Sequence, residues 1–375
     1  MKRVVILCVW LFSVVAGHAQ LSLDECRRLA RENYPEIRQY DLVHQTEQYN
    51  LSNAARAWIP QIAFSAQATW QTDAPNFPKE LTGMLAQQGL EIPGLRKDQY
   101  KVALELNQTI WDGGKSVADK RIARAEAAEQ KTMTDVDLYE LEGRVDDLYF
   151  GILLLDERIA QTNLTLNLLR SNLEKVRALQ RNGVAMQSDA DVLEAELLSV
   201  GQQLIQFESS CDSYRRMLGI FIGQKVGDRK LQRPSAVQPL SGESARPELA
   251  MFAAKIDRLT AQEKMVKSSS MPRLGFFAQG YYGYPGLDYM QSMMNSDWSW
   301  NAMLGVKLSW NFGAYYTQKN NLNKLRISRQ QVEVQRDVFL FNMNLQAAQE
   351  NGDIARLRKA IADDDRIVAL RRSVR

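Results

Sequence analysis

The chain has 375 residues, of which 45% are hydrophobic and 24% charged, and its 47 basic residues nearly balance its 44 acidic ones. This composition excludes a disordered chain. It also provides no strong positive field, so we expect no nucleic-acid partner.

Residues 1–19 have the pattern of a secretory signal peptide. Lys2 and Arg3 precede an apolar stretch, and Gly17-His18-Ala19 supplies a small-residue cleavage site. After it, no run of about 18 apolar residues occurs, so we expect no transmembrane helix, and a membrane would have to be crossed by strands. Cys26 and Cys211 lie in amphipathic helical patterns, which favours buried free thiols over a disulfide.

An internal repeat sets the predicted domain organisation. Residues 35–67 align without a gap with residues 247–279, so that Pro60 matches Pro272. We predict a first structural repeat over 20–238, with a helix from about Leu21, a strand pair within 62–111 and a complete coiled-coil hairpin over 115–232. The second repeat, 239–375, has a helix, a strand pair within 273–311 and an outgoing helix only.

Four segments alternate apolar and polar side chains: residues 62–70, 100–107, 274–282 and 298–310. Their length, their two faces and the large aromatic side chains near their ends are typical of an outer-membrane β-barrel, although a soluble sheet with one buried face has the same alternation. The predicted aromatic girdle comprises Trp70, Tyr100, Trp298, Trp300 and Trp310. The predicted lumen-facing charges are Lys101, Glu105 and Lys307. Four strands cannot close a membrane barrel, and three copies would supply twelve.

The sequence Ile110-Trp111-Asp112-Gly113-Gly114 breaks the second strand and begins a helix of roughly 100 Å, from about Lys115 to Arg181. From Leu138 to Val176 its apolar residues follow a 3-4 heptad spacing. A turn at Asn182-Gly183 leads to a second heptad helix, with Ser188 or Asp189 as its expected N-cap. These two helices predict an antiparallel coiled-coil hairpin.

We expect neither an enzyme nor a cofactor or metal site. His44 is the only histidine after the signal and has no partner at metal-ligand spacing. Asp363, Asp364 and Asp365 are expected on a solvated helix face, and Gly113-Gly114 lacks the Lys-Ser/Thr of a phosphate-binding loop.

Taken together, the opening Leu21–Glu36, the strand entries Trp58-Ile59-Pro60 and Met271-Pro272, the strand exit Ile110–Gly114 and the turn Arg181–Asp189 resemble TolC-like outer-membrane efflux proteins, the outer membrane factors. The resemblance implies a mixed α and β membrane protein, a homotrimer with a 12-stranded β-barrel in outer-membrane lipid and a periplasmic α-barrel of coiled-coil helices. It also implies two partners, a periplasmic adaptor (membrane fusion) protein and an inner-membrane pump.

The implied function is passive export through the exit duct of a tripartite efflux or type I secretion system. Gly183, Ser188 and Asp189 would lie at the periplasmic tip, where family members narrow the pore with carboxylates, although Asp189 can equally be a plain helix cap. A second tip would fall beyond Arg375, which leaves a truncated, transport-inactive copy open as an alternative. A periplasmic coiled-coil scaffold is a separate alternative. We expect residues beyond about 345 to be less ordered than the first hairpin. The sequence predicts no particular substrate or pump.

Overall fold

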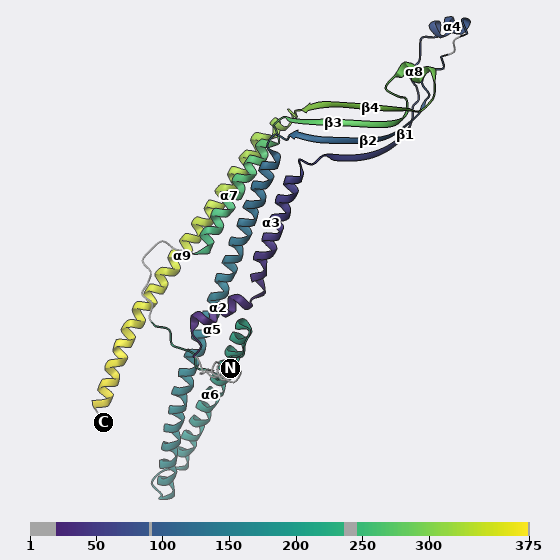
Figure 1. The fold of residues 1–375 in the computed structure, drawn as a ribbon. Helices are drawn as coiled ribbons and strands as arrows, with labels where there is room; N and C mark the ends of the chain where they lie inside the picture. Colours follow the sequence, from purple (N-terminus) through teal and green to yellow (C-terminus); the bar gives the residue numbers. More distant parts are fainter. Residues whose placement is uncertain (1–19, 90–91, 236–245, 374–375) are drawn as a thin grey trace, which may run out of the picture. The chain divides into compact units, whose positions relative to one another are not determined.

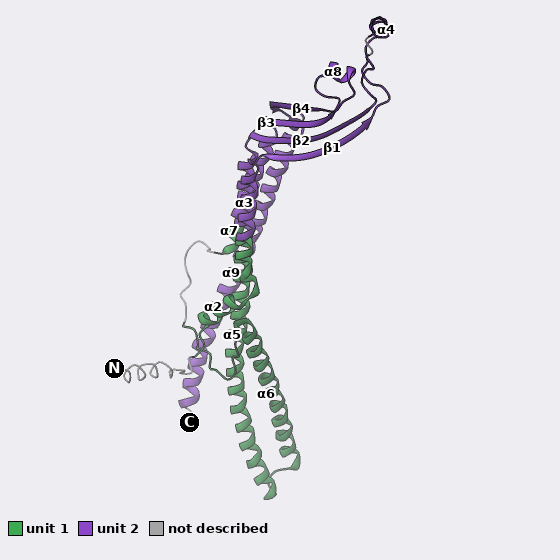
Figure 2. Ribbon diagram, turned by 45° about the vertical axis from the view of Figure 1, so that its right-hand side comes forward, with its two compact units in different colours: residues 1–43, 130–251 green, residues 44–129, 252–375 purple. Residues whose placement is uncertain are grey.

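The computed structural model describes residues 20–89, 92–235 and 246–373. The expected signal peptide, residues 1–19, lies outside the described residues. The chain forms two compact units (Figure 2), unit 1 of residues 1–43 and 130–251 and unit 2 of residues 44–129 and 252–375. Within the described ranges, no helix is both long and apolar enough to cross a membrane.

Unit 2 contains one antiparallel sheet of four strands in the order β1-β2-β3-β4 (Figure 1). The strands closely match the four predicted segments, and they are β1 (Gln61–Trp70), β2 (Asp98–Trp111), β3 (Arg273–Tyr284) and β4 (Ser299–Ser309). Two short helices that the sequence did not reveal, α4 (Lys79–Gln87) and α8 (Tyr289–Met294), lie in the β1–β2 and β3–β4 connections.

The strand register keeps the two predicted faces separate. Phe64 is opposite Leu104, and Leu304 is opposite Ala278, so apolar residues meet apolar residues across the sheet. The register shifts between Thr109 and Trp111. This bulge sets Trp111 opposite Leu274 and thereby moves it to the apolar face, against the alternation of the rest of β2.

The helices of unit 2 pack on α7 (Pro247–Ser268). Arg258 of α7 bonds Glu129 of α5 (Lys115–Arg181), and Arg329 of α9 (Ala314–Ser373) donates to Thr260 Oγ1 at 2.6 Å. The rings of Phe252 and Phe339 lie 5.9 Å apart. Despite these contacts, no described side chain of α9 is fully buried.

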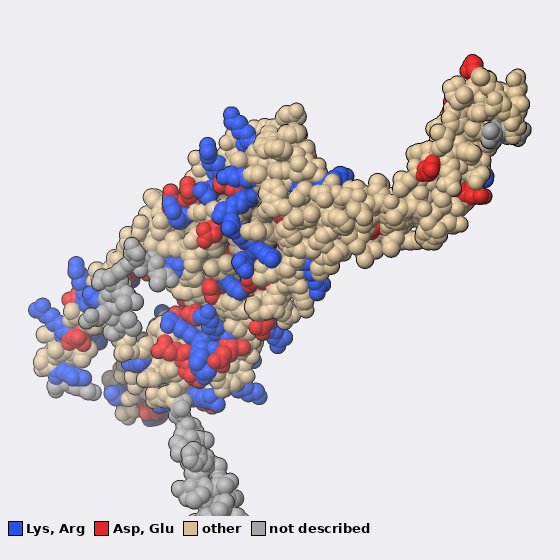
Figure 3. All heavy atoms as spheres, turned by 45° about the horizontal axis from the view of Figure 1, so that its top comes forward, with Lys and Arg blue, Asp and Glu red and all other residues tan. Residues whose placement is uncertain are grey.

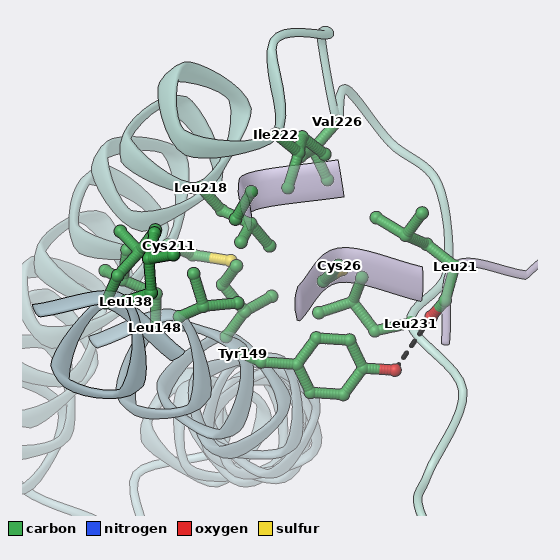
Figure 4. Close-up of a cluster of buried hydrophobic side chains, with 14 residues drawn as sticks. Leu21, Cys26, Leu138, Leu148, Tyr149, Cys211, Leu218, Ile222, Val226 and Leu231 are labelled. Carbon is green, nitrogen blue, oxygen red and sulfur yellow. Dashed lines mark hydrogen bonds between the residues drawn. The ribbon is translucent and has the colours of Figure 1, made fainter. Parts of the chain in front are cut away.

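Unit 1 is built on the predicted hairpin, formed by α5 from residue 130 onward and α6 (Gln187–Ile222). Helix α2 (Leu23–Asn33) packs against α6, and the core between these helices is shown in Figure 4. The apolar heptad residues predicted on α5 are buried where they meet this core, at Leu138, Leu141, Val145, Leu148 and Ile152. Cys26 and Cys211 are buried free thiols in the same core, which confirms that prediction.

Two predicted helix limits were wrong. The single helix expected from about Leu21 is broken, because Tyr34 precedes Pro35 and adopts extended backbone. A short 3-10 helix, η1 (Pro35–Arg38), and a separate helix, α3 (Gln39–Arg56), follow instead. The returning helix α6 ends at Ile222 rather than near residue 232, because Gly223 takes a left-handed conformation with φ of 70°.

After Gly223 the chain turns back onto the core of unit 1. Leu231 forms a parallel bridge with Leu21, and the Gln232 amide donates to the Leu21 carbonyl at 3.1 Å. Leu21 and Leu231 are both buried in the core (Figure 4). This connector therefore packs on the core of unit 1 and does not lengthen helix α6 of the coiled coil.

Candidate functional site

The sheet of unit 2 exposes a broad apolar face. Phe64 is 73% exposed, Trp300 82% and Leu304 75%. On the side shown in Figure 3, charged side chains gather over the helical regions, and the region built on the strands carries few. Continuous apolar surface of this kind indicates contact with a membrane or a partner.

Aromatic side chains cluster at the end of the sheet next to α4 and α8. The Tyr100 and Trp298 rings stack at 5.7 Å, and Tyr282 lies 5.4 Å from Trp298 and 5.0 Å from Trp300. Trp70, opposite Asp98, ends β1 at the same end of the sheet. Four of the five predicted girdle residues therefore lie at this end of the sheet. Tyr282, which was not among the predicted girdle residues, joins them.

A second aromatic group lies at the opposite end of the strands. Trp310 stacks on Phe312 at 4.8 Å and donates its indole N–H to the Ser270 carbonyl at 3.0 Å. The bulge in β2 brings Trp111 to the apolar face at this end, where it is 44% exposed. The sequence analysis missed Trp111 as a girdle candidate, because simple alternation assigns it to the polar face.

The polar face carries a short hydrogen-bonded chain. Lys101 Nζ donates to Gln279 Oε1 at 3.1 Å, and Gln279 Nε2 donates to Glu105 Oε1 at 2.5 Å. Lys101 Nζ also lies 4.6 Å from the centre of the Tyr281 ring. The structure thus links Lys101 and Glu105 through Gln279. Lys307, on β4, takes no part in this chain.

The strand exit predicted at Asp112 forms a fixed turn into α5. The carboxylate accepts from the amides of Gly114 at 2.9 Å and Ser116 at 2.7 Å, and also from the Ser116 hydroxyl. Burial opposes ionisation of Asp112, but these hydrogen bonds prevail and hold its pKa below the usual value. The turn is therefore held by a charged cap.

The hairpin turn occurs where the sequence predicted it. Helix α5 ends at Arg181, and Gly183 has a φ of 77° that favours glycine. The expected N-cap was wrong, because Met186 holds that position and Asp189 is the third helical residue. The Met186 amide donates to Asp189 Oδ2 at 3.0 Å, while Ser188 is exposed and caps nothing. Asp189 therefore supports the helix start while it remains exposed.

In the described ranges, no three His, Cys, Asp or Glu side chains are grouped to hold a metal ion. His44 is exposed on α3, and its Nε2 lies 3.0 Å from Gln48 Nε2.

Comparison with known proteins assigns a family. The model of the family "Outer membrane efflux protein" matches residues 27–223, which is more than half of the chain. The chain therefore belongs to the outer membrane efflux protein family. No curated protein matches it at a significant level.

Solved structures with the same fold include outer-membrane proteins. The outer membrane protein VceC from Vibrio cholerae superimposes with a TM-score of 0.61 at 14% identity, over 85% of this chain and 75% of that one. The outer membrane channel CmeC from Campylobacter jejuni gives a TM-score of 0.58 at 14% identity, over 85% and 68%. The open state of the outer membrane channel MtrE from Neisseria gonorrhoeae gives 0.53 at 14% identity, over 83% and 68%. At these identities the likeness establishes the mixed fold of long helices and a small antiparallel sheet.

Proposed function

We propose that this protein is the outer-membrane exit duct of a tripartite efflux or type I secretion system and passively exports small molecules. The observation that carries the proposal is the four-stranded sheet, with one exposed apolar face between two aromatic groups and one polar face. Its family comprises efflux proteins rather than enzymes, so we propose no catalytic step.

The dimensions of the sheet support membrane insertion. Trp300 and Trp310 are ten residues apart, roughly 33 Å along an extended chain. Tilted by 35–45°, as barrel strands are, this length spans about 23–27 Å, close to the apolar band of about 25 Å in outer-membrane barrels. The two aromatic groups would then lie at the two lipid–water interfaces, with Lys101, Glu105 and Lys307 facing the lumen.

The edges of the sheet support assembly from several copies. Strands β1 and β4 each pair on one side only. An open edge in lipid would leave backbone groups without partners, which costs several kcal/mol for each group. Pairing β4 of one copy with β1 of the next satisfies these groups, and three copies close a barrel of twelve strands. We therefore propose a homotrimer.

The hairpin of unit 1 fits the periplasmic part of such a duct. We propose that the turn at Gly183 and the exposed carboxylate of Asp189 form the tip, which narrows the pore and meets a periplasmic adaptor and an inner-membrane pump. The neighbours CmeC and MtrE are described as outer membrane channels, which agrees with this arrangement. No observation favours a transport-inactive copy or a scaffold over the duct.

Crosslinking across the proposed joint between copies tests the assembly. Ser65→Cys on β1 is combined in turn with Asn301→Cys, Met303→Cys or Lys307→Cys on β4. Within one chain β1 and β4 are three strand spacings apart, roughly 14 Å, which is beyond the reach of a disulfide. A covalent trimer with at least one pair supports the proposal. Conductance of the purified protein in planar bilayers tests the pore, and absence of any oligomer-dependent current contradicts the duct.

A further inference from the structure

A cavity of about 570 Å³ lies in unit 2, where the strands meet the beginning of α5. Its lining includes Glu105, Phe277, Gln279 and Lys307 from the polar face of the sheet and Asp119 from α5. The volume is within the usual range for small-molecule sites, about 300–1,000 Å³. In the proposed trimer this cavity opens to the lumen, so the inference below rests on the proposed function.

The acidic groups of the cavity all have partners within the protein. Asp112 caps the start of α5, and Asp119 Oδ2 lies 2.7 Å from Lys115 Nζ. Glu105 accepts from Gln279 at 2.5 Å. These carboxylates are therefore neutralised or hydrogen-bonded where they stand, which reduces their attraction for a cationic solute.

Two cations that line the cavity lack such a partner in the described structure. In the part of the chain that the structure describes, no carboxylate forms an ion pair with Arg273 or Lys307. Arg273 is opposite Ser309 and Lys307 is opposite Gly275, so the two cations are diagonal neighbours on one face of the β3–β4 pair. Side chains in that relation reach the same ligand. An arginine fork next to a lysine is well suited to hold a carboxylate or a sulfonate.

An aromatic surface lies beside these cations. Phe277 is opposite Gly305, and a Cβ added at Gly305 would lie 2.9 Å from Phe277 Cε1. The ring therefore lies over β4 only because residue 305 has no side chain. Met303, on the same polar face of β4, extends the apolar lining of the cavity. The site offers two cations and a flat apolar surface, which together match an anion with an aromatic body.

We propose that this cavity is a binding site for amphiphilic aromatic anions, such as aryl carboxylates, with Arg273 and Lys307 holding the acid group and Phe277 contacting the ring.

Isothermal titration of the full-length protein in detergent tests the site, with 1-naphthoate as the probe and 1-naphthylmethylammonium as its cationic counterpart. The unmodified protein is expected to bind naphthoate at least tenfold more tightly than the cation. Arg273→Gln with Lys307→Gln is expected to weaken naphthoate binding at least tenfold. The matched control is Lys101→Gln, which removes a cation from the same face outside the cavity lining and is expected to change binding less than twofold.

Two further variants control for misfolding and separate the role of the two charges from that of the Phe277 ring. Arg273→Lys with Lys307→Arg keeps both charges and is expected to bind naphthoate within threefold of the unmodified protein. Phe277→Leu is expected to weaken naphthoate binding at least threefold and to leave acetate binding unchanged. The proposal is overturned if the glutamine variant binds as tightly as the unmodified protein, if Lys101→Gln weakens binding as strongly, or if the cationic probe binds equally well.

Bilayer conductance separates this site from the proposed function. Channels that conduct but show no naphthoate binding overturn the anion site and leave the duct in place. Protein that binds naphthoate without conducting overturns the duct, and the cavity then remains a binding site without transport.

Discussion

The hydroxyl of Tyr149 lies 2.7 Å from the carbonyl oxygen of Leu21 and 2.6 Å from that of Gln232. The side chain is fully buried on α5 (Figure 4), and the Gln232 amide donates in turn to the Leu21 carbonyl. One buried phenol thus fastens two chain segments, the approach to α2 and the connector after α6, onto the core of unit 1.

Replacement Tyr149→Phe is expected to reduce the free energy of unfolding by about 0.5–1.5 kcal/mol, because the buried hydroxyl no longer bonds the carbonyls of Leu21 and Gln232. The measurement is denaturant unfolding of the detergent-solubilised protein. Tyr139→Phe on the same helix is the control, since Tyr139 is 41% exposed and its hydroxyl has no bond in the described structure. We expect a change below about 0.5 kcal/mol for the control. Equal losses in both variants would contradict the role of Tyr149.

The buried thiols lead to a second prediction. Burial, with a smaller contribution from the charge of Glu25, raises the pKa of Cys26 to about 12. Because this pKa is raised in the folded state, the contribution of Cys26 to stability is complete below the unfolded value near pH 9. It is lost as the pH rises towards about 12.

A maleimide at pH 8 is expected to label neither Cys26 nor Cys211 in the folded protein, and to label both after denaturation, since reaction requires an exposed thiolate. Ser188→Cys, at an exposed position in the first turn of α6, serves as the positive control and should react within minutes. Labelling of Cys26 at the rate of this control would show that the core of unit 1 opens readily.

The sequence predicts most of the fold, because two periodicities dominate it. Alternation located all four strands, and heptad spacing located the hairpin and its Gly183 turn. The break at Tyr34 was also within reach, since a residue before proline avoids the helical region.

The remaining features depend on contacts between segments that are distant in sequence. The Leu21–Leu231 bridge and the phenol of Tyr149 join three such segments, and no local pattern signals them. The bulge that moves Trp111 to the apolar face depends on its pairing with β3. Likewise, the pairing of β3 with β4 brings Arg273 near Lys307. Periodicity locates the elements, whereas the candidate sites arise from their registers.

Gly113 provides a third prediction. It has a φ of 72°, and a Cβ there would lie 2.7 Å from Met271 Cβ, whereas Gly114 has a φ of 84° and open space around it. We expect Gly114→Ala to cost about 1 kcal/mol of stability through backbone strain alone. Gly113→Ala should cost at least about 1 kcal/mol more, because the start of β3 must also move. Thermal unfolding measures the stability that each variant loses. Equal losses in the two variants would exclude a close approach of Met271 to residue 113.

The far part of α9 provides a fourth prediction. Leu345 is 56% exposed and Ile361 61%, whereas Leu138 and Val145 of α5 are fully buried. Helical hydrogen bonds without tertiary packing open easily. We therefore expect amides from 345 to 373 to exchange at least a hundredfold faster than those around Leu138.

Hydrogen exchange with mass spectrometry of the purified protein measures this difference. The segment of α9 around Arg329 is the internal control, because Arg329 bonds Thr260 of α7. The protection of this segment should lie between that of residues 345–373 and that of the amides around Leu138. Strong protection across 345–373 would mean that another surface covers this part of α9.

The hairpin turn provides the last prediction, which separates two roles of Asp189. Its carboxylate accepts from the Met186 amide at 3.0 Å, a bond that asparagine preserves without the charge. If three Asp189 carboxylates narrow the proposed pore, Asp189→Asn lowers the cation-to-anion permeability ratio, measured from reversal potentials in a salt gradient across planar bilayers. Asp189→Ala also removes the hydrogen bond from the Met186 amide and is expected to cost about 1 kcal/mol of stability.

The control for this series is Asp212→Asn, which removes a charge from the same helix where Arg216 already pairs with it. We expect its permeability ratio to equal that of the unmodified protein. If Asp189→Asn also leaves the ratio unchanged while Asp189→Ala loses stability, then Asp189 acts only at the helix start. A shift in the ratio without loss of stability in Asp189→Asn assigns the carboxylate to the pore, since only its charge has been removed.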